Sequence, residues 1–224
     1  PTPLQVPLFE GALVDTSLRS ASAVADALAH AHERGVVHRD VKPSNVMITA
    51  NGRVLLVDFG PATTNEEVTR ITRTGAVIGS LPYLAPEHFT GEEEPSVAGD
   101  VYALGVTLYE LLALELPFKG TFDTLRDQKL RGVAPPLRAA NLAVAWDVET
   151  VCTTAMDRDP DRRYASALAF ASDLENLLHL RPISASRPGV MLRALVQPAL
   201  ESHPVADAGP RLCPRRGARA RGPR

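Results

Sequence analysis

The chain has 224 residues, of which 45% are hydrophobic and 22% charged, and its formal net charge is −2. These values are normal for a globular protein of one domain with a tail, and they give no general reason to expect binding to nucleic acid or membranes. Cys152 and Cys213 lie far apart and lack metal-binding spacing, so neither a disulfide framework nor a zinc site is expected. No apolar run reaches membrane-spanning length and no export signal is present, which predicts a cytoplasmic protein.

The first predicted element is a helix that begins at a capping residue among positions 15–17 and ends at Gly35. Residues 1–16 are expected to be a lead-in to this helix. Apolar residues recur along it at helical spacing. They are Leu18, Ala21, Val24, Leu28 and Ala31.

A β-hairpin is predicted next, because residues 46–49 and 53–58 are runs of β-branched and aliphatic residues. Ala50, Asn51 and Gly52 separate the two runs, and Asn-Gly tolerates the positive φ angles of tight turns. The sequence therefore predicts two short antiparallel strands.

The segment from Gly60 to about Pro95 shows little periodicity and is longer than most structureless loops, which indicates a functional or disordered loop. Three helices are predicted after it, a mostly apolar one at 97–114 and two amphipathic ones at 142–157 and 166–180. The predicted fold is thus mainly α with one hairpin.

Polar residues with potential chemistry flank the hairpin on both sides. The segment HRDVKPSN (38–45) precedes it and DFG (58–60) follows it. Because a tight hairpin brings its ends together, the side chains of these two segments should converge. Carboxylate and amide oxygens beside an ammonium group suit Mg²⁺ and phosphate. A lone Asp or Lys here would more often be a solvated loop residue, but the joint pattern favours a site.

These motifs resemble those of the protein kinase family, whose catalytic loop reads H-R-D-x-x-x-x-N and whose metal loop reads D-F-G. With Lys42 at its fifth position, the first motif resembles that of the serine/threonine branch of the family rather than that of the tyrosine branch. Three later segments resemble the family's A-P-E segment, its buried central helix and its late arginine motif. They are GSLPYLAPE (79–87), DVYALG (100–105) and DPDRRYAS (159–166).

The resemblance implies the kinase fold's α-rich C-terminal lobe over residues 17–180, with a short β-hairpin. The remaining residues, 181–224, are rich in Pro and Arg and are expected to form a disordered tail. The arginines at its end could contact nucleic acid, but a solvated tail is the favoured interpretation, and no nucleic-acid partner is expected.

The resemblance also implies catalytic roles. Asp40 would orient the substrate hydroxyl or accept its proton, and Lys42 would steady the transferred phosphoryl group and so contribute to ATP binding. Asn45 and Asp58 would hold the Mg²⁺ ions that bridge the phosphates of ATP.

Other matched residues would control the activation loop. Arg39 would pair with a phosphorylated Thr72 or Thr74, a modification that another kinase molecule could supply in trans. Ser80 stands where the family usually has Thr near the catalytic aspartate.

Three further matched residues would be structural. Glu87 would pair with Arg163 in the interior, and Asp100 would accept hydrogen bonds from the catalytic-loop backbone.

The sequence contains no G-x-G-x-x-G loop, no V-A-I-K lysine and no helix glutamate to pair with it, all of which belong to the family's N-terminal lobe. That lobe is therefore expected upstream of Pro1, and the isolated chain is expected to have weak activity or none. Two functions stay open. One is a serine/threonine kinase that uses ATP and Mg²⁺ to phosphorylate protein substrates, and the other is a non-catalytic, kinase-like interaction module.

Overall fold

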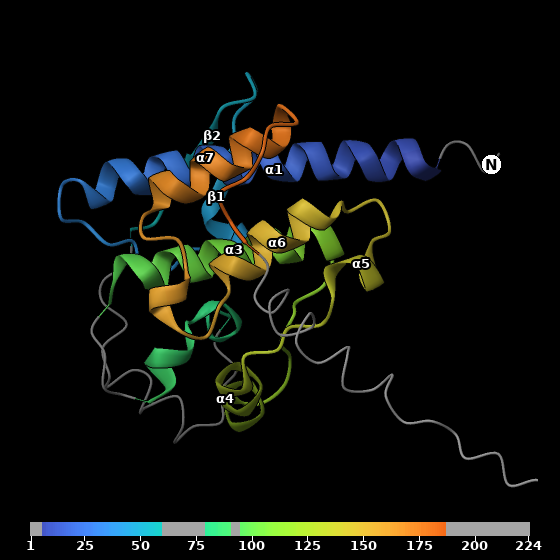
Figure 1. The fold of residues 1–224 in the computed structure, drawn as a ribbon. Coiled ribbons are helices and arrows are strands. Elements are labelled where there is room, and N and C mark those ends of the chain that lie inside the picture. The colour runs from blue at the N-terminus through green and yellow to red at the C-terminus, as the bar shows by residue number, and fades with distance from the viewer. Residues whose placement is uncertain (1–5, 60–78, 91–94, 187–224) are drawn as a thin grey trace, which may run out of the picture. The chain divides into compact units, whose positions relative to one another are not determined.

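The computed structural model describes residues 6–59, 79–90 and 95–186, with backbone only for 6–10 (Figure 1). These residues are mainly helical with one two-stranded sheet, as predicted. The α-helices are α1 (Val6–His32), α3 (Val97–Ala113), α4 (Phe122–Arg131), α5 (Leu137–Ala140), α6 (Trp146–Ala155) and α7 (Ala167–Leu178). The strands are β1 (Val46–Ile48) and β2 (Val54–Leu56), and the 3₁₀ helices are η1 (Pro43–Asn45), η2 (Leu81–Tyr83), η3 (Pro86–Phe89) and η4 (Pro160–Arg162).

Helix α1 begins at Val6, so the predicted start at residues 15–17 was wrong, and residues 6–16 belong to the helix. Asp15 lies inside it and accepts a hydrogen bond from Nε of Arg19 at 2.8 Å, one turn later. A residue with high capping propensity can equally serve as the i,i+4 partner of a basic residue, and the sequence does not separate the two uses.

The C-terminal end of α1 lies where Gly35 predicted it. Gly35 has a φ of 73°. Its N–H donates to the oxygen of His32 at 2.9 Å, and the N–H of Val36 donates to the oxygen of Ala31 at 3.0 Å. This is a Schellman motif, in which a left-handed glycine lets the chain close the last helical turn.

The predicted hairpin is confirmed. Val46 pairs with Leu56, and Ile48 pairs with Val54. The N–H of Thr49 donates to the oxygen of Arg53 at 2.9 Å. The turn between them contains Gly52 with a φ of 80°, which only glycine adopts without strain.

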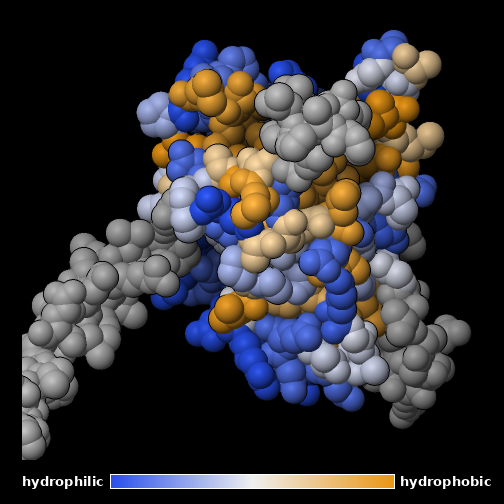
Figure 2. Space-filling view, turned by 90° about the vertical axis from the view of Figure 1, so that its right-hand side faces the viewer, coloured by the Kyte–Doolittle hydropathy of each residue, from blue (hydrophilic) through white to orange (hydrophobic). Residues whose placement is uncertain are grey.

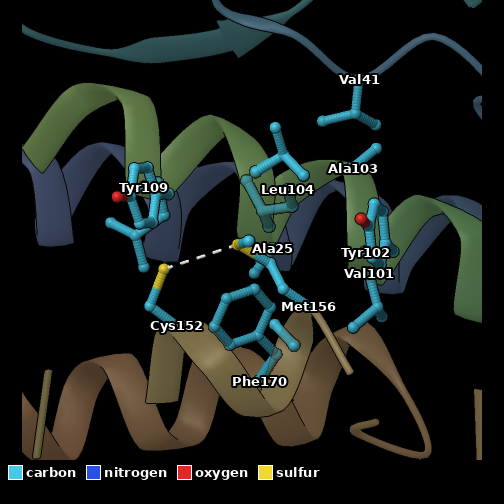
Figure 3. Packing of buried hydrophobic residues seen from close by; sticks show 14 of the residues in the cluster. Ala25, Val41, Val101, Tyr102, Ala103, Leu104, Tyr109, Cys152, Met156 and Phe170 are labelled. Carbon is cyan, nitrogen blue, oxygen red and sulfur yellow. Dashed lines mark hydrogen bonds between the residues drawn. The ribbon is translucent and has the colours of Figure 1, made fainter. Parts of the chain in front are cut away.

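The hydrophobic core lies between α1, α3, α6 and α7, and α1 and α7 run side by side in Figure 1. Figure 3 shows Leu104 of α3, Cys152 of α6 and Phe170 of α7 meeting there, and all three are fully buried. Full burial of one such aliphatic or aromatic side chain contributes roughly 1.5–3 kcal/mol. Helix α3 is thus held from several sides, which makes it a rigid support for the site described below.

Gly105 sets the distance between α3 and α6. A Cβ at this position would lie 2.9 Å from the Cβ of Ala155 and 2.9 Å from the Cγ of Met156. A side chain at position 105 would therefore push the two helices apart.

The sequence did not predict α4. The helix is capped by Thr121, whose side chain accepts from the N–H of Thr124, and it ends at Gly132, which has a φ of 70°. Within its bounds only Leu125 and Lys129 are buried. The apolar stripe was therefore too weak to be recognised, although both capping signals were present.

The packed unit extends past the predicted boundary at residue 180. Asp173 of α7 is fully buried, and its Oδ1 accepts from the N–H and the Oγ of Ser184, both at 2.8 Å. Its Oδ2 accepts from the N–H of Ala185 at 2.9 Å and from the hydroxyl of Tyr164 at 2.9 Å. Residues 183–185 therefore belong to the folded unit. The predicted disorder of the later residues lies outside the described part of the chain.

None of the helices that the structure describes is both long and apolar enough to cross a lipid bilayer.

Candidate active site

The loop that precedes the hairpin is bonded to the strand that leaves it. The N–H of Val57 donates to the oxygen of Asn45 at 2.9 Å. His38 is fully buried, and its Nδ1 accepts from the N–H of Asp40 at 3.3 Å. The ring proton is therefore on Nε2, which donates to the oxygen of Val57 at 3.1 Å. His38 thus joins the entry and the exit of the hairpin.

Asp100, near the start of α3, supports the same loop from the core. Its Oδ2 accepts from the N–H of His38 at 2.7 Å, and its Oδ1 accepts from the N–H of Arg39 at 2.8 Å. Nε2 of His32, in the last turn of α1, lies 2.8 Å from Oδ2. Arg39 has a φ of 72°, a conformation that costs a non-glycine residue about 1–2 kcal/mol. The buried carboxylate offsets this cost and holds the backbone in place.

Asp40, Lys42, Asn45 and Ser80 form one hydrogen-bonded cluster. Nζ of Lys42 donates to Oδ2 of Asp40 at 2.7 Å and to Oγ of Ser80 at 2.7 Å. Nδ2 of Asn45 donates to Oδ2 of Asp40 at 3.0 Å and to its backbone oxygen at 2.8 Å. A carboxylate, an ammonium, an amide and a hydroxyl from two distant segments therefore meet at one point.

The cluster determines the charge of Asp40. Burial by itself would raise the pKa of this carboxyl, but hydrogen bonds from Lys42, Ser80 and Asn45 and the charge of Lys42 together hold the pKa below its usual range. Asp40 is therefore ionised at neutral pH and can accept a hydrogen bond from a hydroxyl group.

Asp58 stands apart from this cluster. Its side chain is exposed, and within the described residues it forms no hydrogen bond or ion pair with Asp40, Lys42 or Asn45. The chain reaches it directly after Val57, which is bonded to Asn45. Asp58 has a φ of 58°. Left-handed conformations of non-glycine residues are uncommon and gather at functional sites, where the surrounding structure enforces them.

The segment from Gly79 to Thr90, hereafter the 79–90 segment, begins at this cluster. The hydroxyl of Tyr83 donates to Oε2 of Glu110 at 2.6 Å. Glu87 and Arg163 form a bidentate ion pair, with nitrogen–oxygen distances of 2.7 and 2.6 Å and almost no side-chain exposure. The segment is thereby fixed to the helical core at several points.

The structure does not place every predicted site residue. Thr72 and Thr74 lie outside the described residues, so the structure places neither of them. Arg39 is exposed. Among the described residues no group of three or more His, Cys, Asp or Glu side chains could hold a metal ion, so a metal bound here would have fewer than three such ligands and would need others from amide oxygens, substrate or water.

Sequence reasoning gave no role to several residues that support the site. One of them is His32, whose Nε2 contacts Oδ2 of Asp100. The position of His32 at the end of α1, just before the loop that precedes the hairpin, was the only sequence signal for this contact. Nothing in the local sequence pointed to the contact between Tyr83 and Glu110, because the partners are 27 positions apart.

Comparison with known proteins places these features in a family. The model of the protein kinase domain matches residues 13–178, which is more than half of the chain. A probable serine/threonine-protein kinase of Streptomyces coelicolor is 35% identical over 176 residues, which cover 78% of this chain and 26% of that protein. The serine/threonine-protein kinase PknB of Mycobacterium tuberculosis is 35% identical over 204 residues, which cover 89% of this chain and 32% of that protein. The serine/threonine-protein kinase PrkC of Bacillus subtilis is 36% identical over 160 residues, which cover 71% of this chain and 24% of that protein.

The chain thus spans between about a quarter and a third of the length of these curated relatives. The family match covers both motifs that flank the hairpin and the whole Asp40 cluster. On these grounds the chain belongs to the protein kinase family, in its eukaryotic-like serine/threonine branch.

Proposed function

We propose that the protein transfers the γ-phosphoryl group of ATP to serine or threonine hydroxyls of protein substrates. The observation that carries this proposal is the cluster of Asp40, Lys42, Asn45 and Ser80, because it holds an ionised carboxylate and an ammonium group side by side. The catalysis of phosphoryl transfer consists largely of positioning and charge stabilisation, and such a pair supplies both.

Asp40 accepts the hydrogen bond of the incoming hydroxyl and so orients its oxygen toward the phosphorus atom. Its low pKa makes it a weak base, which suits a loose transition state in which the hydroxyl proton leaves late. Lys42 already contacts Asp40, and its remaining N–H can stabilise charge on the transferred group. Ser80 fixes the direction of the ammonium group.

Asn45 and Asp58 are proposed to hold Mg²⁺. Both N–H bonds of the Asn45 amide are directed at Asp40, so its carbonyl oxygen is the atom left for a cation. Asp58 supplies an exposed carboxylate beside the same strand end. One or two hard oxygen ligands from the protein, completed by phosphates and water, are the usual Mg²⁺ shell in such sites, and so the residues fit the ion. When bound, Mg²⁺ would neutralise charge on the nucleotide phosphates.

The exposed face of the hairpin is proposed to take the purine ring. Met47 and Leu55 lie directly opposite each other across the two strands, and 56% and 39% of their surfaces are exposed. Cross-strand partners point to the same face of a sheet, so they form one apolar patch close to Asn45. An apolar surface next to a phosphate-binding corner is suited to a nucleotide.

Activation and location follow as proposals. Phosphorylation of Thr72 or Thr74 by another kinase molecule would supply a partner for the exposed guanidinium of Arg39. A cytoplasmic site of action remains the prediction, because the reaction consumes ATP.

The alternative is a kinase-like module that binds proteins without catalysis. It would not need the low pKa of Asp40 or the free amide oxygen of Asn45. The two functions are separated by the transfer of labelled γ-phosphate from ATP to serine and threonine residues of an acceptor protein, measured with the full-length protein and Mg²⁺. The Asp58→Asn variant should lose transfer, whereas the control Asp26→Asn, a change on the surface of α1, should retain it. Transfer by the wild type that does not exceed that of a reaction without the protein would support the interaction module, whereas clear and equal transfer by the wild type and the Asp58→Asn variant would refute the role of Asp58.

A further inference from the structure

Lys129 of α4 is a buried lysine with an unusual set of contacts. Its neighbours on the helix are mostly exposed and polar, and hydrophilic residues prevail in the lower part of Figure 2, at the height of α4 in Figure 1. Lys129, however, is 0% exposed. It lies four positions after the buried Leu125, so it occupies a place on the inner face where helical periodicity calls for an apolar residue.

The ammonium group of Lys129 reaches the backbone of the 79–90 segment. Its Nζ donates to the oxygen of Leu84 at 2.7 Å and lies 3.2 Å from the hydroxyl of Tyr102. The ring centres of Tyr102 and Phe118 are 4.6 and 5.2 Å from it. Burial lowers the pKa of Lys129 well below its ordinary value, an effect that the charge of Glu87 opposes. A buried amine needs hydrogen-bond partners in either protonation state, and the carbonyl of Leu84 supplies one.

The N–H of Leu84 is bonded to the oxygen of Leu81 at 3.3 Å, but the oxygen of Leu84 has no backbone partner in the part of the chain that the structure describes. Leu84 lies between η2 and η3, and within the described residues its oxygen accepts no hydrogen bond other than that from Lys129. The segment begins at Ser80, which is bonded to Lys42, and Lys42 is bonded to Asp40. A hydroxyl presented to Asp40 must therefore bring its flanking residues past this segment.

We propose that Lys129 is a positioning residue that fixes the 79–90 segment through the oxygen of Leu84 and thereby sets how tightly a protein substrate is held. The inference rests on the proposed phosphoryl transfer. Lys129 touches neither ATP nor the reacting atoms in this arrangement. Its removal should therefore weaken the binding of the protein substrate and leave the binding of ATP unchanged.

The test uses the Lys129→Met variant of the full-length protein, which keeps an unbranched, flexible side chain that is one atom shorter and removes the donor. Loss of one hydrogen bond should raise the KM for a peptide substrate about threefold to tenfold, while the KM for ATP stays within about twofold. Hydrogen exchange of the amides of Leu84 and His88, which are bonded within η2 and η3, should accelerate by a similar factor. The Leu125→Ala variant is the matched control, because it weakens the packing of α4 without removing the donor.

The outcomes are distinct. Faster exchange confined to the 79–90 segment, together with a raised peptide KM, supports the proposal. Unchanged exchange in Lys129→Met, or the same exchange pattern and KM change in Leu125→Ala, overturns it. If Lys129→Met does not fold, Lys129→Gln, whose shorter amide cannot reach Leu84 as well, is measured in the same way and judged by the same criteria. Absence of transfer by the wild type would refute the proposed function, while the exchange measurement would still decide whether Lys129 anchors the segment.

Discussion

Replacing Arg163 by Met should destabilise the protein more than any surface change. The guanidinium donates to both carboxylate oxygens of Glu87 and also to the backbone oxygens of Ala98, Asp157 and Arg158. Its side chain is 0% exposed and that of Glu87 is 6% exposed. Arg163→Met leaves a buried carboxylate without its partner, and such a change costs about 3–5 kcal/mol.

This loss is large compared with the total stability of a domain, which is about 5–15 kcal/mol. Urea denaturation of the wild type and Arg163→Met measures the difference in free energy of unfolding, provided that this free energy falls with urea concentration at the same slope in both proteins. The double variant Glu87→Leu/Arg163→Met should be more stable than Arg163→Met alone, because it removes the unpaired carboxylate. Recovery should be incomplete, since three carbonyl groups still lose their donor. A loss below about 1 kcal/mol for Arg163→Met would refute the reasoning, as would a double variant less stable than the single one.

Two further changes test other parts of the structure. Asp100→Asn replaces two charge-assisted hydrogen bonds to the backbone of the catalytic loop by weaker ones. The rate of phosphoryl transfer should fall about tenfold or more, while the affinity for ATP, measured by titration, stays the same. An unchanged transfer rate would contradict the positioning role of Asp100. Asp173→Asn should cost about 1–3 kcal/mol at pH 7. Burial opposes the ionisation of Asp173, but its four hydrogen bonds lower the pKa, so its stabilising contribution is present above the ordinary pKa of a carboxyl group and is lost as the pH falls through the lowered value. Unfolding experiments at pH 7 and pH 3 should therefore show the difference between wild type and variant shrinking in acid, and a constant difference would contradict this account.

The elements that surround the site could be predicted because local chemistry determines them. Gly35 and the Asn51-Gly52 turn require backbone conformations that few residues adopt, so the end of α1 and the hairpin were readable. The start of α1 was not, because Asp15 pairs with Arg19 where it could have capped a helix. Local signals are strong only where one conformation is required.

Contacts between distant residues could not be predicted in the same way. In the sequence, Lys129 is one of several charged residues on a polar helix, and only the tertiary structure shows that it is buried against Leu84. Asp173 likewise resembles a solvated acid until the following chain turns back to bond with it. Tyr83 and Glu110 become partners only through the packing of the 79–90 segment on α3. Such contacts depend on how the helices assemble.

The central claim is that Asp40 and its neighbours catalyse phosphoryl transfer. The most direct test is the turnover rate of the full-length wild type compared with Asp40→Asn, at saturating ATP and Mg²⁺, with circular dichroism to show that both are folded. A positioned carboxylate that orients or deprotonates the hydroxyl contributes about 10²–10⁴ in rate, so the variant should lose at least about a hundredfold. Equal turnover by the two proteins would contradict the account.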